Sequence, residues 1–98
     1  MKLRMSYEVE LTDVALEDFQ RLVDSLPTAR RRDATDAVEA ALERLAASPR
    51  LAQREYLGRP SYHFSFVAGG VHYHWGCTFV MAENEALIRV THLFRTSL

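Results

Sequence analysis

Two runs of alternating residues joined by a pair of glycines constrain the fold of this chain most strongly. Residues 62–68 and 71–79 switch between apolar and polar side chains with the period of a β-strand that has one buried face. Gly69 and Gly70 between the runs can supply the positive φ of a two-residue hairpin turn, which fixes the register of pairing. The sequence therefore predicts a β-hairpin with one apolar and one polar face.

The polar face of this predicted hairpin carries three of the four histidines of the chain. It presents His63, Ser65, His72, His74 and Thr78. The opposite face presents Tyr62, Phe64, Phe66, Val71, Tyr73, Trp75, Cys77 and Phe79. Imidazole titrates near neutral pH and serves both as a proton carrier and as a metal ligand. The polar face is therefore a candidate site for nucleic-acid binding, metal binding or proton transfer.

The segment before the hairpin predicts a strand followed by a helix. Residues 6–12 alternate in the manner of a strand with one buried face. A helix then runs to about Leu26, with Thr12 or Asp13 as its N-cap. Pro27 ends this helix, because proline removes a backbone donor from a helix interior.

A second helix is predicted after a short connection. Thr28 or Asp33 is expected to cap it, apolar residues recur at helical spacing over 34–45, and Ser48-Pro49 stops it. Two helices joined so closely form an antiparallel hairpin that must bury its shared apolar face. We expect it to cover the apolar face of the sheet.

The C-terminal part of the chain predicts a loop over residues 50–61, a turn over 82–85 and a last strand over 86–94. The resulting order is strand, helix, helix and three strands. A chain of 98 residues with 48% hydrophobic content fits one core. We therefore expect a single α+β domain spanning residues 1–98.

The last predicted strand also has two distinct sides. Its core side is expected to carry Ile88, Val90 and Phe94. Its other side, shared with the histidines, is expected to carry Arg89, Thr91 and Arg95. His92 breaks this pattern, because it falls in phase with the core positions.

The composition gives no general attraction to nucleic acid, because the formal net charge is −1. The charge is uneven, however: residues 1–49 hold seven Lys/Arg and ten Asp/Glu, whereas residues 50–98 hold five Arg, three Glu and all four histidines. The second half is thus the part expected to meet an anionic partner.

Cys77 is the one cysteine, so no intramolecular disulfide is expected, and no apolar stretch is long enough to span a bilayer. We expect a cytoplasmic protein that does not enter a membrane.

Four short motifs occur in order along the chain. Residues 7–12 form an entry strand that opens into a helix, and residues 57–58 precede the second strand. Residues 70–75 begin with glycine and alternate histidine with aromatic residues, and residues 90–95 form a hydrophobic-His-basic run. In order and spacing these motifs resemble the RelE/ParE family of bacterial toxins from type II toxin–antitoxin systems, over nearly the whole chain.

The resemblance implies a helical hairpin packed on one face of a four-stranded, mostly antiparallel sheet, with a concave face on the other side. RelE-like members bind messenger RNA in the ribosome and cut it, whereas ParE-like members inhibit DNA gyrase. Members are held by a small antitoxin protein. The resemblance therefore implies a toxin with an antitoxin partner, most simply a metal-independent mRNA endonuclease that inhibits translation. No cofactor is expected, and a homodimer is a further expectation.

Two positions can be compared with arginines of the family. Arg95 matches the late-strand arginine, whereas His72 stands where the family has an arginine in the third strand. This departure leaves two alternatives open: an inhibitor of DNA gyrase, or a binding module of the same fold that has lost catalysis.

Histidines on the predicted polar face can cleave RNA without a metal. One imidazole takes the 2′-hydroxyl proton, another protonates the leaving oxygen, and an arginine stabilises the charge that builds up at phosphorus. The predicted catalytic residues are His63, His72, His74 and Arg95. The predicted nucleic-acid-binding residues are Arg50, Arg54, Arg59 and Arg89.

Two further patterns, the three histidines as a metal site and a run of arginines, can be explained without a specific ligand. The three imidazoles could hold zinc with one open position, but no Asp or Glu falls on that face to orient the rings, so no metal is expected. The arginine run over residues 30–32 could meet an anionic partner. Because Asp33 and Asp36 can compensate its charge, we favour an ordinary helix surface.

Overall fold

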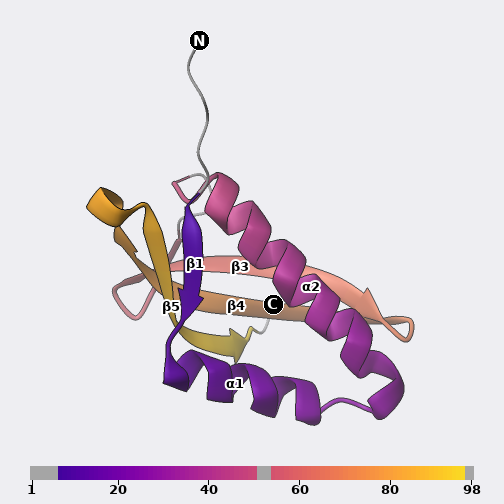
Figure 1. Cartoon of the computed structure of the whole chain (residues 1–98). Coiled ribbons are helices and arrows are strands. Elements are labelled where there is room, and N and C mark those ends of the chain that lie inside the picture. Colours follow the sequence, from indigo (N-terminus) through magenta and orange to yellow (C-terminus); the bar gives the residue numbers. More distant parts are fainter. Residues whose placement is uncertain (1–6, 51–53, 97–98) are drawn as a thin grey trace.

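Two helices cover one face of a five-stranded sheet in the computed structural model, which describes residues 7–50 and 54–96 (Figure 1). The strand order is β1-β5-β4-β3-β2, in which β1 and β5 are parallel and the other neighbours are antiparallel. The elements are β1 (Glu8–Leu11), α1 (Asp13–Asp24), α2 (Thr28–Ala47), β2 (Arg54–Tyr56), β3 (Arg59–Ala68), β4 (Val71–Ala82), a 3₁₀ turn (Glu83–Glu85) and β5 (Leu87–Arg95). The predicted α+β architecture is confirmed, with five strands instead of the expected four.

The start of α1 follows the prediction, whereas the start of α2 does not. The Thr12 hydroxyl accepts a hydrogen bond from the Ala15 N–H at 3.1 Å and so caps α1. Pro27 occupies the N-cap position of α2 and no side chain caps that helix, so the predicted cap at Thr28 or Asp33 is wrong. Residue 6, the predicted start of the first strand, lies outside the described residues. Among those described, no helix is both long and apolar enough to cross a membrane.

The β3–β4 hairpin has the predicted register. Gly69 and Gly70 adopt φ values of 58° and 77°, as a two-residue turn requires. Phe64 pairs with Trp75, and both belong to a buried cluster that includes Ala41 of α2, the helix that lies over this hairpin in Figure 1. Trp75 is only 1% exposed and belongs to the same buried cluster as Val38 of α2. The apolar face of the hairpin therefore forms the floor of the core.

The fifth strand comes from the segment that was predicted as a loop. β2 and β3 form a second hairpin, in which Tyr56 pairs with Arg59. Leu57 and Gly58 make its turn at φ values of 53° and 75°. The backbone there is left-handed, which glycine adopts readily and leucine does not. The prediction missed β2 because its three residues are too few to display a period.

A β-bulge in β5 reverses the predicted sides of its last residues. Thr78 pairs with His92 but Phe79 pairs with Val90, so Thr91 is an extra residue in the ladder. The alternation therefore shifts by one residue after Val90. Leu93, at 4% exposure, takes the core position that was assigned to Phe94. The residues after Leu93 also lie on the side of the sheet opposite to the one predicted.

Phe94 and Arg95 are consequently on the sides opposite to those predicted. Phe94 pairs with Gly76, on the face that the helices leave uncovered. Arg95 pairs with the buried Trp75 and so shares the helix-covered face. The placement of Arg95 beside the histidines was therefore wrong, because the prediction assumed unbroken alternation.

Candidate functional site

The sheet face opposite the helices, here called the open face, holds most of the predicted site residues. Cross-strand partners point to the same side of a sheet, so the register assigns them. The open face carries Arg54, Tyr56, Arg59, Ser61, His63, Ser65, His72, His74, Thr78, Arg89, His92 and Phe94.

Two of the predicted catalytic histidines line the same shallow cavity. A cavity of about 200 Å³, here called the depression, is lined by Arg54, His63, Phe64, Ser65, His74 and Thr96. His63 lies opposite Gly76 and His74 lies opposite Ser65, so the two imidazoles are diagonal neighbours on adjacent strands. The depression therefore combines two proton carriers with one guanidinium group.

His63 is the histidine whose chemistry is most clearly set by its surroundings. Its Nε2 lies 3.2 Å from the Oγ of the buried Ser61. Burial, and secondarily the positive charge of Arg54, lowers the pKa of His63 below the usual 6.5. The neutral imidazole is thus the favoured form at neutral pH, which suits a proton acceptor.

His72 does not join the other two histidines. It pairs with Val67, four residues along β3 from His63, which is roughly 13 Å at the rise of a strand. It is exposed near the hairpin tip. Among residues 7–50 and 54–96, no group of three His, Cys, Asp or Glu side chains is placed to hold a metal ion.

The predicted nucleic-acid-binding arginines have different environments. Arg54 lines the depression, and Arg59 lines a second cavity nearby. Arg89 forms an exposed ion pair with Glu10 at 3.3 Å, so its charge is already balanced. Arg50 is exposed just after α2 and belongs to none of the five strands. Among the described residues, Arg54 and Arg59 of the open face form no ion pair.

The arginine run at the start of α2 has a structural role. Arg30 donates to the Tyr73 hydroxyl at 2.9 Å, tying α2 to β4. Arg31 donates to the carbonyl oxygens of Leu26 at 3.0 Å and Asp24 at 3.1 Å. These bonds satisfy carbonyls at the end of α1 and fix the turn between the helices. Arg30 and Arg31 thus hold the helices in place through contacts other than the expected compensation by Asp33 and Asp36.

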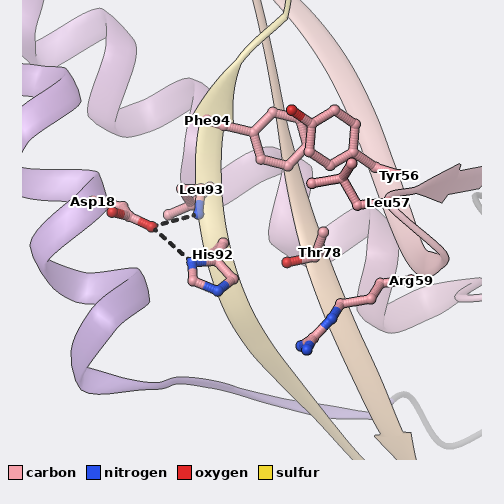
Figure 2. Close-up of a pocket in the computed structure, with 8 residues that line it drawn as sticks. All are labelled: Asp18, Tyr56, Leu57, Arg59, Thr78, His92, Leu93 and Phe94. Carbon is pink, nitrogen blue, oxygen red and sulfur yellow. Dashed lines mark hydrogen bonds and ion pairs between the residues drawn. The ribbon is translucent and has the colours of Figure 1, made fainter.

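A second cavity on the open face was not predicted. It measures about 360 Å³ and is here called the hollow (Figure 2). It is lined by Asp18, Tyr56, Leu57, Arg59, Thr78, His92, Leu93 and Phe94. These residues come from α1, the β2–β3 hairpin, β4 and β5. Only the bulge at Thr91 turns His92 and Phe94 toward it, so strict alternation could not reveal the hollow.

Asp18 lines one side of the hollow, next to the edge of the sheet at β5. β1 pairs with β5 only as far as Val90, and α1 lies along the rest of that edge. The Oδ2 atom of Asp18 accepts the Leu93 N–H at 3.2 Å and lies 3.5 Å from Nδ1 of His92 (Figure 2). Asp18 thus both satisfies a strand donor and restrains an imidazole.

The other side of the hollow is an aromatic pair. Tyr56 stacks on Phe94 with ring centroids 4.5 Å apart, and Phe94 meets His63 edge-on at 5.8 Å. Gly76 leaves room for this arrangement, since a Cβ there would approach Phe94 at 3.0 Å and His63 at 3.1 Å. The Phe94 ring therefore lines the hollow and also contacts His63, which lines the depression.

Solved RelE structures have the same fold. A chain of the RelBE2 toxin–antitoxin complex from Mycobacterium tuberculosis matches with a TM-score of 0.59 at 19% identity, covering 93% of this chain and 99% of that chain. An E. coli RelE toxin mutant in the free state gives 0.59 at 12% identity, covering 93% and 84%. The intact E. coli RelBE complex gives 0.53 at 15% identity, covering 95% and 100%. No protein-family model and no curated protein matches the sequence. The chain thus has a RelE-like fold.

Proposed function

We propose that this chain is the toxin of a toxin–antitoxin pair and that it cuts messenger RNA without a metal ion, thereby inhibiting translation. The observation that carries the proposal is the depression, where His63, His74 and Arg54 meet on a sheet face that the helices leave open. The RelE-like fold supports the same class, because the matching structures are described as toxins or toxin–antitoxin complexes.

The residues of the depression fit internal transfer at an RNA phosphodiester. His63, favoured as the neutral imidazole, takes the proton of the 2′-hydroxyl as this oxygen attacks phosphorus. The bond between phosphorus and the 5′-oxygen breaks, and protonated His74 gives its proton to that oxygen. Arg54 stabilises the negative charge on the phosphoryl oxygens. The products are a 2′,3′-cyclic phosphate and a 5′-hydroxyl, and no oxidant or metal is consumed.

Two of the residues predicted to be catalytic, His72 and Arg95, are not assigned a catalytic role in this proposal. His72 lies too far along the hairpin to share one phosphate with His63, so we assign it a contact with the RNA outside the reacting bond. Arg95 shares the face of Trp75, and we do not place it at the phosphate. The proposed regulator is a small antitoxin that keeps RNA away from the open face.

Expression of the chain in bacteria from an inducible promoter tests the proposal. Growth arrest with cleaved transcripts is expected, and arrest should disappear in the double variant His63→Ala/His74→Ala. The single variant His72→Ala should retain most of the effect, which controls for loss of an exposed imidazole. Arrest with induced DNA damage and intact transcripts would indicate a gyrase inhibitor instead. Normal growth despite soluble, folded protein would indicate a binding module without toxicity.

A further inference from the structure

We propose that the hollow is a subsite for one unpaired nucleotide of the RNA, which stacks its base on Tyr56 and places its phosphate between Arg59 and His92. The identity of the polymer rests on the proposed function, whereas the nucleotide chemistry rests on the hollow itself. Its volume of about 360 Å³ lies in the size range of pockets that take small molecules.

The aromatic wall supplies a stacking surface. One side of the Tyr56 ring rests on Phe94, and the tyrosine remains 43% exposed. Leu57 extends the apolar wall and is 86% exposed at the hairpin turn. Because every nucleobase has a flat π face, such a wall binds bases with little preference for sequence. A duplex does not fit this arrangement, since its bases are stacked on one another.

Two cationic or cation-forming groups face each other across the hollow. Arg59 extends from β3 and His92 lies on β5, on opposite sides of the hollow (Figure 2). Arg59 makes no ion pair with any residue in the described ranges. A guanidinium group and an imidazolium group can donate charge-assisted hydrogen bonds to the same phosphate.

Asp18 acts as a positioning residue for His92. Its Oδ2 atom restrains Nδ1 of the imidazole, while its Oδ1 atom accepts from Arg21 at 3.1 Å. The carboxylate is mostly buried, with 13% of its side chain exposed, so its own position is fixed. The Nε2 atom of His92 has no hydrogen-bond partner among the described residues, so it can meet a ligand.

The position of the hollow links it to the proposed chemistry. Phe94 contributes to the hollow and also touches His63, which lines the depression. A nucleotide held against Tyr56 therefore places the adjoining phosphodiester toward His63. In this arrangement the hollow aligns the RNA strand and the depression cuts it.

Titration of the ¹⁵N-labelled protein with adenosine 5′-monophosphate or cytidine 5′-monophosphate tests the subsite, with ribose 5-phosphate and inorganic phosphate as comparison ligands. The nucleotides should perturb the amide signals around the hollow and bind about tenfold more tightly than ribose 5-phosphate, as one stacked base allows. Equal binding of nucleotides and inorganic phosphate would overturn the subsite and leave a simple anion site.

Matched variants separate the two halves of the subsite. Tyr56→Leu, which keeps apolar cover without a ring, should remove the advantage of nucleotides over ribose 5-phosphate. Arg59→Ala should weaken all phosphate-bearing ligands about tenfold, whereas Arg32→Ala, which removes the same charge from exposed α2, should not. Equal losses in the two arginine variants would contradict the assignment.

The titration is independent of RNA cleavage, because a mononucleotide contains no internucleotide bond. A wild-type protein that binds nucleotides in the hollow but leaves RNA intact would contradict the proposed function and support the subsite. A protein that cuts RNA while nucleotides leave the signals of the hollow unchanged would overturn the subsite and support the proposed function.

Discussion

The depression and the hollow lie side by side on the open face but are built in different ways. The two histidines of the depression come from the β3–β4 hairpin, whose ladder is continuous from Ser61 to Ala68, whereas Arg54 and Thr96 come from β2 and from the segment just after β5. The hollow gathers residues from four elements and depends on the bulge at Thr91 and on the Asp18 contact. A continuous strand ladder fixes the spacing between side chains, as proton transfer requires. A cavity lined by several elements has a defined shape, which can select a ligand. We therefore assign proton transfer to the first region and ligand selection to the second.

The largest expected difference between the two regions concerns the core beneath the hairpin. Trp75→Ala should lower the free energy of unfolding by about 3–5 kcal/mol, because it removes a buried aromatic ring. Phe94→Ala should cost less than about 2 kcal/mol, since that ring is partly exposed and packs on Tyr56 and His63. Denaturant titration of both variants measures the difference. Equal losses would mean that Phe94 is a core residue as well.

The edge of the hollow should be sensitive to its aspartate. Asp18→Ala leaves the Leu93 N–H without its carboxylate acceptor, at an expected cost of about 1–3 kcal/mol. Arg21→Ala breaks only the exposed end of the same network, where the arginine side chain is 72% exposed, and should cost less than about 0.5 kcal/mol. Thermal or denaturant unfolding compares the two. A loss in Arg21→Ala as large as in Asp18→Ala would show that the strand edge is not the stabilised feature.

The depression should respond to the charge of Arg54 as well as to burial. In Arg54→Ala the pKa of His63 should rise, measured by NMR titration of its ring signals, but it should stay below 6.5 because burial is the larger cause. Because its pKa is lowered, His63 is protonated less readily in the folded state than in the unfolded chain. Stability should therefore decrease as the pH falls through about 6.5, and less so in Arg54→Ala. An unchanged pKa in the variant would exclude Arg54 as a neighbour of His63.

The smallest expected effect is at Cys77, beneath the hairpin. Burial raises the pKa of this thiol to about 12, with a smaller opposing contribution from a hydrogen bond to the Tyr62 backbone. Thiolate is the reactive form, so thiol reagents at pH 8 should leave the native protein unlabelled and label it after unfolding in denaturant. Fast labelling of the native protein would show that the hairpin separates readily from the helices.

The shared face of the two histidines in the depression could be predicted from the sequence because the geometry of a hairpin is local. The alternation of residues 62–79 and the Gly69-Gly70 turn decide which side chains share a face, and the structure has that register. His72 shares this face as predicted, but its partner Val67 lies four residues along β3 from His63. Two residues that share a face still need to be neighbours.

The hollow could not be predicted because its contacts join distant parts of the chain. The Thr78 and Thr91 hydroxyls lie 2.7 Å apart across the bulge, and Asp18 meets Leu93 from 75 residues away. No local pattern marks either contact. The only available signal was His92, which already failed to fit the alternation of its strand. A residue that breaks a period can thus indicate a bulge.

The central claim is that RNA meets the open face of the sheet and not the helices. NMR mapping with a short single-stranded RNA, blocked against cleavage by 2′-O-methyl groups, tests it most directly. The account predicts that amide signals of β3, β4 and β5 around His63, His74 and His92 shift together, while those of the outer surfaces of α1 and α2 stay unchanged. Shifts confined to the helices, with the strands unaffected, would contradict the account.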